Sequence, residues 1–182
     1  MNPIEVVGAI TEAAGDALFV SSLGTATSAL RAATGDGPHL YLGGSMGSAL
    51  AVGLGVAEKR PTRDVVVVMG DGETLMGAGS LWTMAGLAPP NLLAVVLVDG
   101  HYTITGGQPL GVPDVFGGVA AALGIAVGVA RTVEEITEHV ERLARPALLE
   151  VRYDERTWPG PSPFVDPPVV RWRFEQAAGA AP

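Results

Sequence analysis

Continuous apolar stretches alternate along this chain with stretches in which apolar residues recur every three or four positions. Two of the continuous stretches, residues 64–69 with four consecutive valines and residues 92–98, lack the alternation of apolar and polar side chains. Strands without that alternation are typical of a parallel sheet that is covered on both faces. The pattern therefore predicts an α/β fold with a parallel β-sheet flanked by helices on both faces.

The same patterns give approximate element boundaries. Strands are predicted at residues 17–21, 64–69, 92–98, 125–129 and 147–151. Helices are predicted at residues 3–15, 25–33, 45–59, 73–87, 114–123 and 132–143. A glycine-rich loop is expected over residues 99–113, and His39 and His139 are expected at the surface. In such folds ligands bind beyond the carboxyl ends of the strands, so the loops that follow the strands are the first place to look for chemistry.

Composition narrows the class of protein. The chain has 182 residues, of which 48% are hydrophobic and 16% charged, which suits one folded domain with a sizeable core. Its 11 basic and 19 acidic side chains give a formal charge of −8, and a surface without a basic cluster argues against nucleic-acid binding. An anionic small ligand is still possible, because backbone N–H groups and a bound cation can hold phosphate.

Several other classes are also disfavoured. The absence of cysteine excludes disulfides, thiolate zinc sites and cysteine-ligated iron–sulfur clusters within this sequence. Charges and glycines interrupt every apolar stretch well before the ~20 residues that a membrane span needs. The first residues do not resemble a signal peptide, so we expect a cytoplasmic protein that does not bind membranes.

A Gly-Asp-Gly sequence, Gly70 to Gly72, follows the buried strand at residues 64–69 and precedes a predicted helix. Glycines allow the backbone to approach a ligand closely, and the free N–H groups of a helix start attract anions. Asp71 is placed to reach a hard cation that lies between the protein and a phosphate. A tight turn in which Asp71 only caps the helix is an equally good interpretation of these three residues.

A second aspartate, Asp99, follows the next predicted strand and is itself followed by Gly100 and His101. Loops after neighbouring parallel strands lie side by side, so Asp71 and Asp99 could share one cation. Two adjacent carboxylates repel each other unless a cation lies between them or one of them is protonated. The alternative is a chance pair of aspartates in loops.

Met46 lies among glycines in the sequence Gly43-Gly44-Ser45-Met46-Gly47. A methionine at such a position usually fills a gap in the core. The functional alternative is a side chain that stands under a ligand, with bare backbone on either side of it.

Together these residues resemble the thiamine diphosphate motif, in which Gly-Asp-Gly is followed one helix and one strand later by Asn. The Gly44–Gly47 loop and the run Tyr102-Thr103-Ile104-Thr105-Gly106-Gly107-Gln108-Pro109 narrow the resemblance. They look like the β subunit, or C-terminal domain, of sulfopyruvate and phosphonopyruvate decarboxylases. The resemblance covers about residues 18–153 and implies the thiamine diphosphate-binding fold.

The resemblance also implies roles for individual residues. Asp71 and Asp99 would ligate Mg2+ through their side chains, and His101 through its backbone carbonyl. Met46 would be the apolar wedge that keeps the cofactor bent, and the Gly44 carbonyl would accept the aminopyrimidine N–H. Further implied contacts of the cofactor are Ser22, Gly24, Thr25, Ser45, Gly70, Gly72, Glu73, Thr74, Tyr102 and Thr103. Substrate contacts are expected from Thr103, Thr105 and Gln108, and a role of the His101 imidazole as a general acid or base is a less favoured alternative.

Two residues depart from the family pattern. Asp99 replaces the usual Asn, which keeps an oxygen ligand but adds a negative charge to the site. Glu73 stands where a small residue is usual; a carboxylate suits a helix start but would repel a diphosphate, so its side chain is expected to point away. Both departures leave room for an altered or degenerate activity.

The resemblance implies a missing part. Thiamine diphosphate enzymes need a glutamate from a pyrimidine-binding domain, and 182 residues do not accommodate both domains. We therefore expect a pyrimidine-binding α subunit as partner, in a hetero-oligomeric assembly with the active site at the interface. Residues 101–113 are expected to become ordered when the cofactor binds.

The reaction that the resemblance favours is the non-oxidative decarboxylation of a small 2-oxo acid to an aldehyde. An acetolactate synthase-like carboligase and a non-catalytic structural subunit with a degenerate site are the alternatives. An oxidoreductase that uses ferredoxin is disfavoured, because the sequence lacks cysteine.

The sequence divides into an expected cofactor-binding domain, residues 1–153, and a proline-rich C-terminal tail, residues 154–182. Within the tail, residues 159–168 with Trp158 and Phe164 could dock on the partner or form a frayed end.

Overall fold

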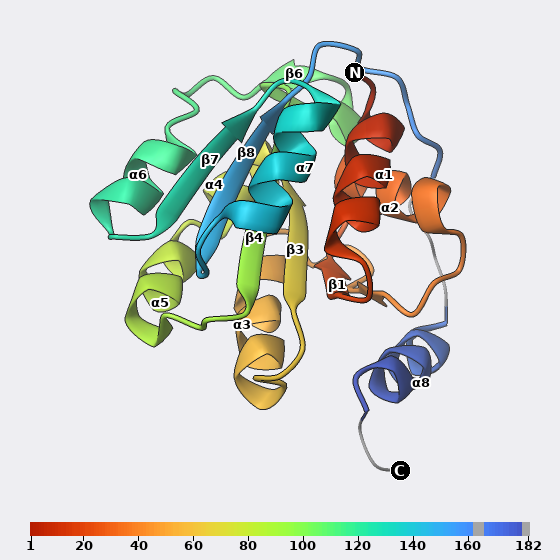
Figure 1. Ribbon diagram of the computed structural model, residues 1–182. Coiled ribbons are helices and arrows are strands. Elements are labelled where there is room, and N and C mark those ends of the chain that lie inside the picture. The colour runs from red at the N-terminus through yellow and green to blue at the C-terminus, as the bar shows by residue number, and fades with distance from the viewer. Residues whose placement is uncertain (162–165, 180–182) are drawn as a thin grey trace.

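A parallel β-sheet forms the centre of the computed structural model, which describes residues 1–161 and 166–179. Within this part of the chain, the strands of the sheet follow the order β2-β1-β3-β4-β8-β7 (Figure 1). These strands are β1 (Leu18–Ser21), β2 (Leu40–Tyr41), β3 (Val65–Gly70), β4 (Leu92–Val98), β7 (Ala126–Ala130) and β8 (Ala147–Arg152). The α/β fold with a parallel sheet is thus confirmed.

Helices cover both faces of this sheet. They are α1 (Pro3–Ala14), α2 (Gly24–Thr34), α3 (Ala49–Lys59), α4 (Asp71–Met76), α5 (Gly79–Leu87), α6 (Phe116–Ala122), α7 (Val133–Arg142) and α8 (Pro167–Ala177). Helices α1, α2 and α7 pack on one face, and α3, α5 and α6 on the other (Figure 1). Strand β3 shows why its valines are continuous: Val66 and Val68 enter the first core, while Val65 and Val67 enter the second.

Tertiary contacts change three of the predicted boundaries. The helix predicted at residues 45–59 begins at Ala49, because Gly47 has a φ of 84°, which a helix does not accommodate. The helix predicted at residues 73–87 is two helices, α4 and α5, which separate where Gly77 meets the backbone of Gly47. The loop predicted at residues 99–113 contains an antiparallel pair, β5 (His101–Tyr102) with β6 (Gln108–Pro109), and a 3-10 turn, η1 (Thr103–Thr105).

The region predicted as a proline-rich tail contains helix α8. Its Val170 and Phe174 are buried at 6% and 7% exposure, and Arg60 and Arg63 donate hydrogen bonds to the carbonyls of Ala178 and Ala177. Of the residues expected to dock on a partner, Trp158 is exposed and Phe164 lies outside the described residues. Every helix in the described part of the chain is too short or too polar to cross a bilayer.

The register of the sheet brings the loops of interest together. Strands β3 and β4 pair in parallel along their whole length, from Val65 opposite Leu92 to Gly70 opposite Leu97. Both strands end at the same edge of the sheet, where β3 is followed by Asp71 and β4 by Asp99.

Candidate functional site

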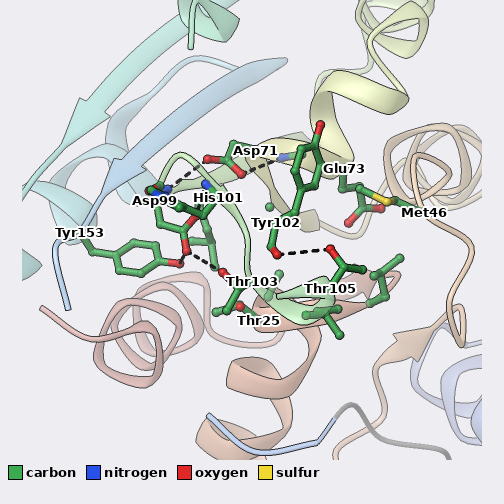
Figure 2. A pocket seen from close by; sticks show the side chains of 17 residues that line it. Thr25, Met46, Asp71, Glu73, Asp99, His101, Tyr102, Thr103, Thr105 and Tyr153 are labelled. Atoms are coloured by element: carbon green, nitrogen blue, oxygen red, sulfur yellow. Dashed lines mark hydrogen bonds between the residues drawn. The ribbon is translucent and has the colours of Figure 1, made fainter. Parts of the chain in front are cut away.

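A pocket of about 100 Å3 lies at the carboxyl ends of β1, β3 and β4 (Figure 2). Its wall consists of the start of α2, the loop before α3, the first residues of α4, and strand β5 with the turn η1. The residues singled out in the sequence that line it are Gly24, Thr25, Met46, Gly70, Asp71, Gly72, Glu73, Asp99, His101, Tyr102, Thr103 and Thr105. Ser22, Gly44, Ser45, Thr74 and Gln108 lie outside this wall.

Asp71 joins the two loops that follow β3 and β4. Its side chain is 2% exposed; Oδ1 accepts a hydrogen bond from the N–H of Gly72 at 2.7 Å, and Oδ2 accepts from the N–H groups of Asp99 at 3.1 Å and Gly100 at 2.6 Å. Burial raises the pKa of Asp71; the Gly100 N–H opposes this rise, and the charge of Asp99 adds to it. The carboxylate is therefore fixed in place and is electrostatically unfavourable as long as no cation is near it.

Asp99 is held by donors on two sides. Oδ1 accepts from the backbone N–H of His101 at 2.9 Å, and Oδ2 accepts from the hydroxyls of Thr103 at 3.0 Å and Tyr153 at 3.4 Å. Burial raises the pKa of Tyr153, and the negative charges of Asp99 and Asp71 raise it further. These hydroxyls fix the direction of the carboxylate without neutralising it, and the nearby guanidinium of Arg156 donates to the Asp99 backbone carbonyl at 3.4 Å and not to the carboxylate.

A hard cation fits this pair of carboxylates. Among the described residues, Asp71 and Asp99 form no ion pair with a Lys, Arg or His side chain, and no cluster of three or more His, Cys, Asp or Glu suits a metal. Two carboxylate ligands leave the other positions of an oxygen-coordinated ion to carbonyls, water or a phosphate, which is how proteins usually bind Mg2+. The site therefore suits a metal that is shared with an anionic ligand.

The contacts of His101 bear on both of its predicted roles, as a metal ligand through its carbonyl and as a general acid or base through its imidazole. Its ring Nδ1 is 2.8 Å from the carbonyl oxygen of Asp99, a hydrogen bond that holds the imidazole against its own loop. Its backbone pairs with Pro109 in the β5–β6 hairpin. The ring lines the pocket, and whether its carbonyl reaches a metal stays a prediction.

Glycine at position 72 allows an aromatic side chain to cover the start of α4. A Cβ atom built on Gly72 would lie 2.5 Å from Cε1 of Tyr102, so a larger residue would displace the ring. Thr74 is turned away from the pocket, because its hydroxyl donates to the Gly70 carbonyl at 2.8 Å. Of the predicted diphosphate contacts on this helix, the Thr74 hydroxyl and the Gly72 N–H already have partners within the chain, Gly70 and Asp71. The contacts of the other N–H groups at this helix start with a diphosphate stay a prediction.

Met46 and Glu73 lie together on the other side of the pocket (Figure 2). The N–H of Met46 donates to the Gly44 carbonyl at 2.9 Å, which is the carbonyl assigned to the aminopyrimidine by the family resemblance. Glu73 is 4% exposed, and the Ser22 hydroxyl donates to its Oε1. Burial raises the pKa of Glu73 to about 7, against the opposing effects of Ser22 and the N–H groups of Ala49 and Gly47.

One residue expected at the surface is half-buried, and one residue of the pocket was not singled out in the sequence. His39, expected at the surface, is half-buried: its ring packs edge-on against Phe19, with centroids 5.3 Å apart, and burial lowers its pKa to about 4. Tyr153, which the sequence did not bring forward, lines the pocket and contacts Asp99. Its position just after β8, at the same edge of the sheet as Asp71, is the signal that could have identified it.

Comparison with known proteins places this geometry in context. Residues 24–151 match the family described as "Thiamine pyrophosphate enzyme, C-terminal TPP binding domain". Phosphonopyruvate decarboxylase of Streptomyces viridochromogenes is 48% identical over 93 residues, which are 51% of this chain and 23% of that protein. Sulfopyruvate decarboxylase subunit beta of Methanothermobacter thermautotrophicus is 39% identical over 108 residues, which are 59% of this chain and 58% of that protein.

Solved structures share the fold. The thiamine diphosphate-dependent 4-hydroxybenzoylformate decarboxylase of Rhodococcus jostii RHA1 matches with a TM-score of 0.67 at 20% identity, over 88% of this chain and 33% of that one. The 2-oxoglutarate:ferredoxin oxidoreductase of Magnetococcus marinus matches with a TM-score of 0.67 at 17% identity, over 84% of this chain and 62% of that one. The chain thus spans about a quarter of the phosphonopyruvate decarboxylase and less than two thirds of the beta subunit.

Proposed function

Since the chain belongs to the thiamine pyrophosphate enzymes through their C-terminal TPP binding domain, we propose that it binds the diphosphate of this cofactor together with Mg2+. Thiamine pyrophosphate is the same compound as thiamine diphosphate. The proposed enzyme is a 2-oxo acid decarboxylase similar to sulfopyruvate and phosphonopyruvate decarboxylases, in which this chain is the small (β) subunit. Residues 1–153 are the proposed cofactor-binding unit.

The observation that carries the proposal is the placement of Asp71 and Asp99. The two carboxylates follow the ends of neighbouring strands, are fixed by N–H or hydroxyl donors, and line the same pocket as Met46. Carboxylates that form no ion pair among the described residues and lie next to backbone N–H groups suit a cation that bridges the protein to a phosphate.

The residues of this chain bind and orient. Asp71 and Asp99 would hold Mg2+, with the His101 carbonyl as a further oxygen ligand, and the N–H groups at the start of α4 would face the diphosphate. Tyr102, whose ring covers Gly72, and the hairpin around it would keep water from this end of the pocket. Thiamine diphosphate, when bound, supplies the electron sink that stabilises the carbanion left when a 2-oxo acid loses CO2.

A second protein unit is part of the proposal. Relatives at 39% and 34% identity are named as beta subunits of sulfopyruvate decarboxylase, which supports a hetero-oligomer. The partner would be a pyrimidine-binding subunit that supplies a glutamate and part of the pocket for a small 2-oxo acid. We place the complex in the cytoplasm.

Titration calorimetry with the partner subunit present tests the proposal. Wild-type protein should bind thiamine diphosphate in the presence of Mg2+ and not after chelation. Asp71→Ala should abolish binding, whereas Asp154→Ala, an equal change of charge at an exposed position, should preserve it. Absence of binding by the wild-type complex would refute the proposal. Product analysis with and without an acceptor aldehyde then separates decarboxylation from carboligation.

A further inference from the structure

The side chain of Glu73 connects three segments of the chain at the pocket. It projects from α4, accepts a hydrogen bond from Ser22 just after β1, and lies close enough to the N–H groups of Gly47 and Ala49 for these to affect its ionisation. It is 4% exposed, and its Oε2 makes no hydrogen bond of ordinary geometry with any of the described residues. A buried carboxylate in this position requires an explanation, because burying a charge is costly unless something nearby stabilises it.

The start of helix α3 is the nearby feature that could stabilise this charge. α3 has 11 residues, and its N-cap, Ser48, makes no side-chain capping bond within the described part of the chain, because its hydroxyl donates to the Ser45 carbonyl. The first N–H groups of a helix carry a positive partial charge that an anion stabilises. The Glu73 carboxylate, on the neighbouring helix α4, is the acidic group near these N–H groups.

The loop that carries Met46 leads directly into this start of α3. Gly47 follows Met46 and packs backbone against backbone on the end of α4, where a Cβ atom built on Gly77 would lie 2.2 Å from the Gly47 carbonyl oxygen. Helix α4 therefore touches this loop at Gly77 by close packing and near Gly47 and Ala49 by the charge of Glu73. Figure 2 shows Glu73 beside Met46 on the same side of the pocket.

We propose that Glu73 is a positioning residue, whose carboxylate fixes the start of α3 and thereby holds Met46 against the cofactor pocket. This inference rests on the proposed function. It assigns a role to the carboxylate that follows Gly72, which would otherwise only repel a diphosphate. It also separates two tasks within α4: Asp71 at its start serves the metal, and Glu73 serves the loop on the other side of the pocket.

Three measurements on the full chain with its partner test the proposal in Glu73→Gln, which keeps the size of the side chain and removes its charge. Hydrogen exchange of the N–H groups at residues 44–49, without ligand, should become roughly tenfold faster, the effect of losing a partly buried charge–helix interaction. The dissociation constant for thiamine diphosphate at saturating Mg2+ should rise by a similar roughly tenfold factor. The constant for Mg2+ with inorganic pyrophosphate, a probe that does not reach Met46, should stay unchanged.

Glu150→Gln is the matched control. Glu150 is also buried, at 3% exposure, and also faces a helix start, where its Oε1 accepts a hydrogen bond from the N–H of Gly117 in α6. Its substitution should speed exchange at the start of α6 and leave residues 44–49 and cofactor binding as in the wild type. If Glu73→Gln does not fold, Glu73→Asp, which withdraws the charge by one methylene, should show the same pattern to a smaller extent.

Other outcomes overturn the proposal in distinguishable ways. Tighter pyrophosphate binding by Glu73→Gln would mean that the carboxylate repels the diphosphate directly. Equal losses for pyrophosphate and thiamine diphosphate, with faster exchange throughout, would mean a general role in folding. If the wild-type complex binds both thiamine diphosphate and pyrophosphate but Glu73→Gln leaves exchange at residues 44–49 unchanged, the positioning role is refuted. If the wild-type complex binds neither ligand, the proposed function itself is refuted.

Discussion

Replacing Gly77 with alanine tests whether the contact between helix α4 and the loop carrying Met46 is as tight as the structure indicates. Gly77 has φ −96° and ψ 17°, a conformation open to alanine, so the substitution adds no backbone strain of the kind that reserves a position for glycine. The added Cβ would lie 2.2 Å from the carbonyl oxygen of Gly47, 2.9 Å from its carbonyl carbon and 3.0 Å from its Cα. All three are backbone atoms, which cannot rotate away.

The magnitude follows from this overlap. Cβ atoms essentially never approach other heavy atoms more closely than 3.0 Å, so the loop and the helix must separate by about 1 Å. Overpacking of this kind costs about 1–3 kcal/mol. Because the loop carries Met46 into the pocket, the same shift should weaken thiamine diphosphate binding more than the binding of Mg2+ with pyrophosphate.

Urea unfolding of the full chain measures the cost, with Gly86→Ala as the control. Gly86 lies in α5, is exposed, and a Cβ there meets no atom of the described residues within 4 Å. Its replacement should stabilise the protein by about 0.5–1 kcal/mol through helix propensity alone. If Gly77→Ala is as stable as the wild type, or is stabilised as Gly86→Ala is, the close approach of the two segments is not real and the reasoning about the Met46 loop fails with it.

Two further predictions concern stability outside the pocket. Burial lowers the pKa of His39 from 6.5 to about 4, so the unfolded chain binds more protons than the folded chain between these pH values. The free energy of unfolding should therefore fall as pH falls through this window, by up to about 3 kcal/mol, and by nearer to about 2 kcal/mol for a ring partly open to water. His39→Leu should remove this part of the pH dependence in urea titrations. The side chain of Asn91, which is 5% exposed, donates to the carbonyls of Ala57, Arg60 and Arg63 at 3.3, 3.0 and 2.7 Å. Asn91→Ala should therefore lower the free energy of unfolding, measured in urea, by about 2–3 kcal/mol. A change below ~0.5 kcal/mol would mean that water satisfies these carbonyls in the variant.

The sheet could be predicted from the sequence because its strands are buried on both faces. A strand such as β4, whose residues are all buried, has no polar positions to obscure it. By contrast, β2 has two residues, too few for any pattern, and the division between α4 and α5 arises from a contact with a segment about thirty positions earlier in the chain. Local patterns carry no information about such contacts.

In the candidate site, too, some residues could be predicted from the sequence and others could not. Asp71 and Asp99 could be singled out because each ends a predicted strand, and parallel pairing then brings them together. The direction of a side chain is a tertiary property: Glu73 turns toward Ser22 and the start of α3 while still lining the pocket. Tyr153 reaches Asp99 only because β8 lies next to β4 in the sheet, an order that the sequence does not state.

Helix α4 connects the metal side of the pocket, at Asp71, with the loop that carries Met46 on the other side. With six residues it is too short to be stable alone, so its position depends on the contacts at its two ends. At the first end, Asp71 accepts hydrogen bonds from the loop after β4; near the other, Gly77 packs on the loop that carries Met46. A cation bound by Asp71 would offset the cost of burying this carboxylate, which raises its pKa, and the smaller repulsion from Asp99, and would so stabilise α4. A stabilised α4 would hold the Met46 loop through Gly77 and, as proposed above, through Glu73. Metal binding and the order of that loop should therefore be linked through this one helix, even though the loop contributes no ligand to the metal.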